Sequence, residues 1–125
     1  IIKNPIKEKS YTLAIEIVEL FKEVRKSHKE FDLTKQLLRS GTSIAANIEE
    51  GDGAFSDKDF HYKFSIAYKE AKETHFWIRL LRDTSYINDD KANKMLSQLT
   101  EILKLLGAIL KTMRNKTNET FYISH

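Results

Sequence analysis

The sequence contains no cysteine, one proline and four glycines among 125 residues. The absence of cysteine excludes disulfide bonds, thiolate-bound metals, iron–sulfur clusters and a cysteine nucleophile. Proline and glycine usually make up about 12% of a chain, so a turn-rich all-β architecture would lack the residues that form its turns. The composition therefore favours long helices.

Long apolar runs are also missing. Even the most apolar stretch is interrupted by Lys104 and Lys111, and a transmembrane helix needs about 18 consecutive apolar residues. The first five residues lack the charged and apolar segments of a signal peptide. With 41% hydrophobic and 31% charged residues, the chain can bury a core. We expect one cytoplasmic domain that makes no membrane contact.

Apolar residues recur at helical spacing in four segments. Short connections between helices of similar length are typical of an all-α, antiparallel, up-down-up-down four-helix bundle. We expect the bundle to occupy residues 1–115 and residues 116–125 to form a frayed tail, because the apolar periodicity is lost there. The predicted helices run from Pro5 to about Lys29, from the residue after Asp32 to Glu50, from the residue after Ser56 to about Thr84, and from the residue after Asn88 to residue 115.

Helix boundaries are indicated by capping residues. Asp32 is expected to cap the second helix with its carboxylate, and Gly51 to end that helix in the left-handed conformation. Ser56 and Asp59 have the spacing of a capping box, and Asn88 can cap the fourth helix.

The first helix carries two apolar stripes. One contains Leu13, Ile17, Leu20 and Val24, and the other contains Tyr11, Ala14, Ile15, Val18 and Phe21. Together they form an arc wider than one bundle core requires. Either the second stripe is buried against another subunit, or the helix presents one broad face to a tight core.

The second helix is rich in small residues. Ser40, Gly41, Thr42, Ser43, Ala45 and Ala46 lie between Arg39 and Asn47. Because small side chains allow two backbones to approach closely, we expect Gly41 and Ser43 to lie in a tight contact with another helix or another protomer.

Polar residues on the facing halves of the second and third helices suggest specific partners. Antiparallel packing brings Arg39 within reach of Glu70 or Glu73. A charge-assisted bond would offset the cost of partly burying these groups, either to Arg39 or to a neighbouring subunit. The alternative is that both carboxylates are solvated beside neighbouring lysines. Asn47 is a candidate for fixing the packing register at a helix contact.

Motifs of catalysis and metal binding are missing. The residues three before His28, His61 and His75 are basic, so the Glu-x-x-His pairs of di-iron bundles do not occur. The sequence also lacks HExxH, Walker and GxGxxG motifs. A Ser–His–Asp arrangement stays open, although no strained nucleophile turn favours it. We expect no enzyme activity, no metal and no cofactor.

One string of residues is distinctive. Arg39-x-x-Thr42-Ser43-Ile44-x-x-Asn47-Ile48-x-Glu50-Gly51 is followed by Phe60, and then by Ile66-Ala67-x-Lys69-Glu70-Ala71-x-Glu73-Thr74 with Trp77 and Leu80-Leu81. Over residues 5–115 the chain resembles the bacterial four-helix bundle proteins also called 23S ribosomal RNA intervening-sequence proteins.

The resemblance implies an antiparallel bundle that assembles into a ring-like homopentamer, with no established enzymatic activity. Relatives of this family include accessory proteins of diversity-generating retroelements, which cooperate with a reverse transcriptase and nucleic acid.

In such a bundle the end of the first helix, the start of the second, the end of the third and the start of the fourth share one pole. We call this end the basic pole, because it gathers ten basic and six acidic side chains, a net charge of +4. They are Lys22, Arg25, Lys26, Lys29, Lys35, Arg39, Arg79, Arg82, Lys91 and Lys94, against Glu23, Glu30, Asp32, Asp83, Asp89 and Asp90. Repeated around a ring, this excess would form a multivalent positive rim for phosphates. The alternative is that the basic residues only complement helix C-termini and maintain solubility. The candidate nucleic-acid-binding residues are Lys22, Arg25, Lys26, Lys29, Lys35, Arg79 and Arg82.

Three functional hypotheses follow. The first is a homo-oligomeric scaffold or adaptor that binds RNA or DNA through the basic pole. The second is a protein–protein interaction module that does not bind nucleic acid. The third is an enzyme without a recognisable motif, which would require an apolar cleft with convergent polar groups.

Overall fold

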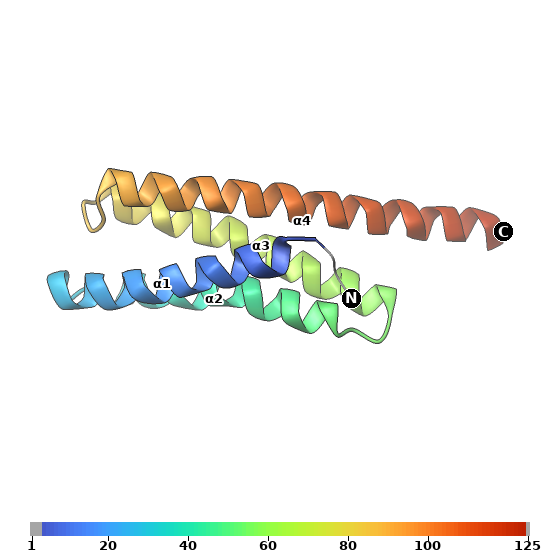
Figure 1. Ribbon diagram of the computed structural model, residues 1–125, viewed down its shortest axis with the longest axis horizontal. Helices are drawn as coiled ribbons and strands as arrows, with labels where there is room; N and C mark the ends of the chain where they lie inside the picture. Colours follow the sequence, from blue (N-terminus) through green and yellow to red (C-terminus); the bar gives the residue numbers. More distant parts are fainter. Residues whose placement is uncertain (1–3, 125) are drawn as a thin grey trace.

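The computed structural model describes the backbone of residues 4–124 and the side chains of residues 4–115. It contains four helices, α1 (Ile6–His28), α2 (Asp32–Asp52), α3 (Asp57–Asp83) and α4 (Asp89–Ser124), and the described residues form no strand. The helices run antiparallel to their neighbours in chain order (Figure 1). The predicted all-α four-helix bundle is confirmed.

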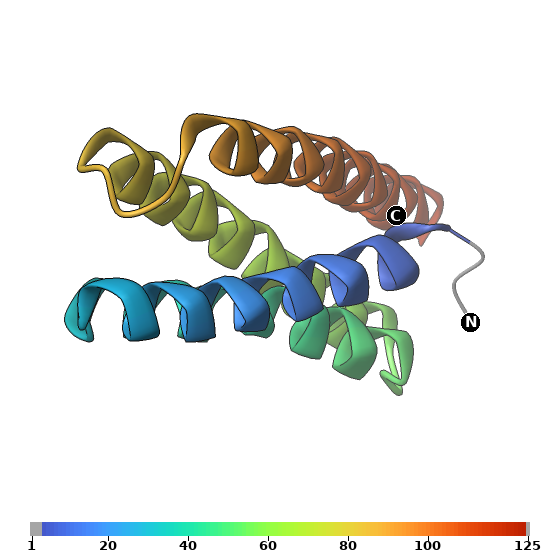
Figure 2. The same cartoon turned by 60° about the vertical axis from the view of Figure 1, so that its left-hand side comes forward.

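Each helix packs against two others. The backbones of α1 and α2, α2 and α3, α3 and α4, and α1 and α4 lie close together, whereas within the described residues the diagonal pairs do not approach as closely. Figure 2 shows α1 lying along α2, with α4 on the other side of α3. Because neighbouring helices are antiparallel, the α1–α2 and α3–α4 connections lie at the same end of the bundle (Figure 1).

The core takes only one of the two apolar stripes on α1. Leu13 and Ile17 are fully buried and Leu20 is 2% exposed. On the second stripe, Tyr11 is 63% exposed and Ile15 is 49% exposed. The alternative that α1 presents one broad face to the core is therefore wrong for Tyr11 and Ile15, whose side chains lie on the surface of the bundle.

The start of α2 differs from the sequence prediction. Glu30, rather than Asp32, caps the helix: its Oε1 accepts the N–H of Leu33 at 2.8 Å and its Oε2 accepts the N–H of Thr34 at 2.9 Å. Asp32 already has helical backbone geometry as the first residue of α2. The longer Glu side chain reaches the free amides from the connection before the helix.

The end of α2 also differs. Gly51 lies within the helix, which continues to Asp52, and no described glycine has a positive φ. Gly51 is needed for space: a Cβ atom there would stand 2.6 Å from the ring of Phe64, which is fully buried on α3. The predicted left-handed stop is wrong, and close helix packing is the reason for the glycine.

Two predicted caps are confirmed. The Oγ of Ser56 accepts the N–H of Asp59 at 3.1 Å and begins α3. The Oδ1 of Asn88 accepts the N–H of Lys91 at 2.8 Å in the first turn of α4.

The last helix is longer than predicted. We expected the bundle to end at residue 115, but the backbone of α4 remains helical to Ser124 and projects beyond the other helices (Figure 1). No proline or glycine follows Gly107 to interrupt the hydrogen-bond ladder, although the apolar periodicity has ended. Among the described residues, no helix combines the length and apolar character needed to cross a membrane.

Candidate functional site

The basic pole is divided by the structure into two halves. On the α3–α4 half, two basic side chains have acidic partners: Arg82 Nε donates to Asp83 Oδ1 at 2.8 Å, and Lys91 Nζ donates to Glu23 Oε2 of α1 at 2.6 Å. Arg79 is exposed, with its Cζ 5.9 Å from the centroid of the Phe76 ring. Asp89 and Asp90 at the start of α4 bring further negative charge to this half.

The α1–α2 half carries four lysines without a described ion-pair partner, together with the acidic residues Glu30 and Asp32. Lys22 and Lys26 are four residues apart on one face of α1, Lys29 follows directly after the end of the helix, and all three are exposed. Lys35 is exposed in the first turns of α2. None of these four lysines forms an ion pair with a residue whose side chain the structure describes.

An aromatic residue, Phe31, lies between Lys29 and Lys35 in the sequence. The Cζ atom of Arg25 lies 4.5 Å from the centroid of the Phe21 ring and 4.7 Å from that of Phe31. Phe31, in the α1–α2 connection, is 47% exposed. The Nε of Arg25 is buried without a hydrogen-bond partner in the described part of the chain. We call Arg25, Phe31 and the four lysines the α1–α2 corner.

Sequence reasoning found the basic residues of this corner but missed Phe31. The available signal was a large aromatic residue in a short connection between helices, preceded by Lys29 and followed by Lys35. Its proximity to Arg25 depends on how tightly the chain turns, which spacing alone does not give. The turn is tight because Lys29 adopts φ 52° and its N–H donates to the carbonyl oxygen of Arg25.

A second polar group lies between α2 and α3. Arg39 Nη1 donates to Glu70 Oε2 at 3.0 Å, Arg39 Nη2 donates to Glu73 Oε2, and the indole N–H of Trp77 donates to the same Glu73 oxygen at 2.9 Å. We call these four residues the Arg39 cluster. The predicted bond between Arg39 and the carboxylates is present within one chain, and the Glu70 side chain is only 18% exposed.

The remaining polar candidates on α2 bond within their own helix. Ser43 Oγ donates to the carbonyl oxygen of Arg39 at 2.7 Å, and Asn47 Nδ2 donates to the carbonyl oxygen of Ser43 at 2.8 Å. The hydrogen bond shown for Asn47 therefore does not reach another helix. Gly41 does lie in a tight contact, with Ile17 of α1 in the same bundle.

Hydrogen bonds lower the pKa of two carboxyl groups here. The indole N–H of Trp77 is the largest cause for Glu73, opposed by burial and assisted by Arg39. For Glu30 burial opposes ionisation, but the N–H groups of Leu33 and Thr34 outweigh it and lower the pKa. Both carboxylates are thus held ionised by structural bonds.

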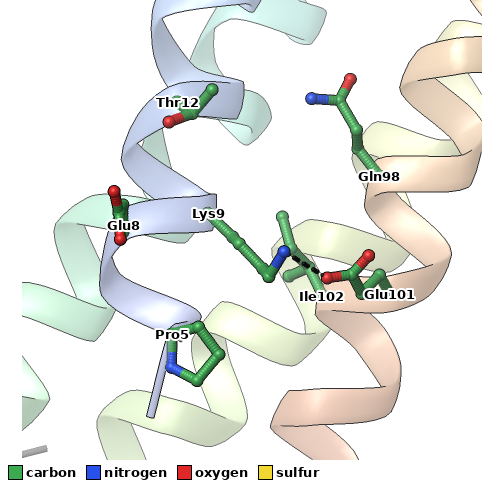
Figure 3. Close-up of a pocket in the computed structure, with 7 residues that line it drawn as sticks. All are labelled: Pro5, Glu8, Lys9, Thr12, Gln98, Glu101 and Ile102. Carbon is green, nitrogen blue, oxygen red and sulfur yellow. Dashed lines mark ion pairs between the residues drawn. The ribbon is translucent and has the colours of Figure 1, made fainter. Parts of the chain in front are cut away.

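The surface between α1 and α4 contains a groove of about 390 Å³, shown in Figure 3. Lys9 Nζ lies 2.5 Å from Glu101 Oε1 across it, and Thr12 and Gln98 line its other end. Among the described residues, no group of three or more His, Asp or Glu side chains could hold a metal ion.

Comparison with known proteins extends this description. A family model described as 23S rRNA-intervening sequence protein matches residues 3–108. The chain belongs to this family. No curated protein matches the chain. The family description indicates no catalytic activity.

A solved structure is similar to this member of the 23S rRNA-intervening sequence protein family. It is a protein of unknown function from the S23 ribosomal protein family of Bacteroides thetaiotaomicron VPI-5482. The two are 47% identical with a TM-score of 0.83, and the match covers 85% of this chain and 98% of the other.

Proposed function

We propose that this protein is a non-enzymatic, homo-oligomeric adaptor that acts in the cytoplasm and binds RNA or DNA through its basic pole. The observation that carries the proposal is the row of exposed lysines at the α1–α2 corner, Lys22, Lys26, Lys29 and Lys35, which lack acidic partners among the described side chains. Nucleic-acid phosphates are the abundant multivalent anions that such a row would bind.

Assembly would strengthen this binding. Tyr11 and Ile15 remain exposed on α1, which leaves apolar area for contact with another copy. The ring-like arrangement and the number of five subunits come from the resemblance to the family. In a ring, phosphate contacts on neighbouring subunits add through effective concentration, so weak individual sites give useful affinity.

The binding experiment compares two triple variants by fluorescence anisotropy with a labelled 20-base-pair DNA duplex and an RNA of the same length. One variant is Lys22→Gln, Lys26→Gln and Lys29→Gln. Its control is Lys58→Gln, Lys104→Gln and Lys111→Gln, which removes the same charge from exposed positions outside the basic pole.

We expect the affinity of the wild-type protein for duplex DNA to fall steeply with salt. Each phosphate contact contributes about 0.9 to the slope of log K against log salt for a duplex, so the corner variant should lower the slope by about 2–3. The control should leave the slope nearly unchanged. Equal slopes for the two variants, or no binding by the wild type at about 50 mM salt, would contradict nucleic-acid binding through the pole and favour a protein–protein interaction module.

Light scattering tests the assembly separately. Five copies of a 14.6 kDa chain give a mass of about 73 kDa. A monomer at micromolar concentration would remove the oligomeric part of the proposal and leave the binding part to be decided by anisotropy.

A further inference from the structure

The α1–α2 corner differs from an ordinary basic patch, because an aromatic ring is exposed within it. Phe31 is 47% exposed, while Arg25 covers part of its ring at 4.7 Å from Cζ to the centroid. Lysines alone bind phosphates of any nucleic acid, whereas an exposed ring adds a surface on which a base can stack. In a duplex the bases are already stacked and only their edges are accessible.

The guanidinium of Arg25 also lacks its usual partners. It makes no hydrogen bond or ion pair with a described residue, and its Nε is buried without an acceptor. Arginine donors in proteins are normally satisfied, because leaving a buried donor without a partner costs free energy. The two flanking rings hold the guanidinium in place, and its terminal nitrogens are available for an anionic acceptor.

The nearby helix start cannot supply the phosphate contact instead. Free N–H groups at the start of a helix often bind anions in proteins. At the start of α2, however, the Glu30 carboxylate already accepts the N–H groups of Leu33 and Thr34. An incoming phosphate is therefore left to Arg25 and to the lysines around it.

We propose that the α1–α2 corner is a binding site for single-stranded nucleic acid, in which an unpaired base stacks on Phe31 and the adjoining phosphates contact Arg25 and the lysines of α1. This inference rests on the proposed function and makes it more specific. It names Phe31 as the residue that distinguishes single strands from duplexes.

The test uses the full chain and three substitutions. Phe31→Leu keeps an apolar side chain but removes the aromatic face, and Phe31→Trp keeps a face for stacking. Phe55→Leu is the matched control, because Phe55 is a fully exposed phenylalanine in the α2–α3 connection at the opposite end of the bundle. The probes are a fluorescein-labelled 20-nucleotide oligo(dT) and a mixed-sequence duplex of 20 base pairs, and circular dichroism checks that each variant remains folded.

We expect Phe31→Leu to weaken oligo(dT) binding about five- to tenfold, the effect of losing one base–aromatic stack, with duplex binding unchanged within about twofold. Phe31→Trp should retain the affinity, and its added fluorescence above that of Trp77 should be quenched by oligo(dT). Phe55→Leu should bind like the wild type.

The outcomes separate this inference from the proposed function. Wild-type binding to both probes with no effect of Phe31→Leu, or an equal loss on both probes, would overturn base stacking while nucleic-acid binding stands. Preference of the wild type for the duplex would do the same. No binding to either probe would overturn the proposed function, and the stacking site with it.

Discussion

Gly41 of α2 lies directly against Ile17 of α1. A Cβ atom at Gly41 would stand 2.8 Å from Ile17 Cγ2 and 2.9 Å from Cγ1. Ile17 is fully buried, and its β-branched side chain has little rotational freedom in a helix, so it cannot move aside. The glycine sets how closely α1 and α2 approach, and thus the geometry of the connection that carries Phe31.

Replacing Gly41 should therefore destabilise the bundle although alanine is the better helix former. Overpacking costs about 1–3 kcal/mol, which exceeds the gain of up to about 1 kcal/mol in helix propensity. We expect Gly41→Ala to lower the free energy of unfolding and Gly41→Leu to impair folding or assembly further. Chemical denaturation followed by circular dichroism measures both.

Gly107→Ala is the matched control, because a Cβ atom there would stand 3.9 Å from Tyr68, an ordinary contact distance. This substitution should stabilise α4 by about 0.5–1 kcal/mol. If Gly41→Ala were also stabilising, the close contact with Ile17 would not limit the approach of the two helices.

The helices could be predicted from the sequence because apolar periodicity and local capping residues are short-range signals. Ser56 and Asn88 cap the helices that they were expected to cap. Gly51 was misinterpreted, because one glycine suits both a left-handed stop and a close packing site. Only the position of Phe64 in three dimensions distinguishes the two.

The start of α2 gives a second prediction. Glu30→Ala should cost about 1 kcal/mol, since it leaves the N–H groups of Leu33 and Thr34 without their acceptor. Asp32→Ala should cost less, because no cap hydrogen bond depends on its side chain. Thermal unfolding of the two variants shows whether Glu30 or Asp32 caps α2. A larger loss of stability for Asp32→Ala than for Glu30→Ala would mean that Asp32, the residue predicted from the sequence, is the cap.

The Arg39 cluster makes the free energy of unfolding depend on pH in the acidic range. The folded-state pKa of Glu73 lies below its ordinary value of 4.5, first because the indole N–H of Trp77 donates to it. The stabilisation is therefore present above that ordinary value and is lost as pH falls through the lower, folded-state pKa. Its size is small, under about 1 kcal/mol, because the Glu73 side chain is 36% exposed and screened by solvent.

Glu73→Gln should lower the free energy of unfolding near pH 7 by under about 1 kcal/mol and match the wild type well below pH 4.5, so that the acid dependence of unfolding is reduced. Trp77, the one tryptophan of the chain, reports the same event by fluorescence as its hydrogen bond weakens. Glu101→Gln is a control, since Glu101 pairs with Lys9 and not with a member of the Arg39 cluster. An unchanged acid profile in Glu73→Gln would show that the cluster does not contribute.

Part of the candidate site could also be predicted. The spacing of Arg39 against Glu70 and Glu73 follows from antiparallel pairing, and their ion pairs are present. The division of the basic pole into a paired and a free half could not be predicted, because it depends on the bond between Lys91 and Glu23, which are 68 residues apart in sequence. Local patterns give the charges of a surface, while tertiary contacts determine which of them are neutralised.

The exposed stripe of α1 gives the last prediction. Ile15 and Tyr11 contribute little to the core, being 49% and 63% exposed, so Ile15→Glu with Tyr11→Glu should leave the monomer folded. If the proposed assembly buries this stripe, two charges introduced there would be costly to desolvate, and the mass measured by light scattering should fall toward that of one chain. Ser97→Glu with Thr112→Glu, which introduces two charges at exposed positions of α4, should leave the mass unchanged. An oligomer of unaltered mass in the Ile15 and Tyr11 variant would show that the copies meet through another face.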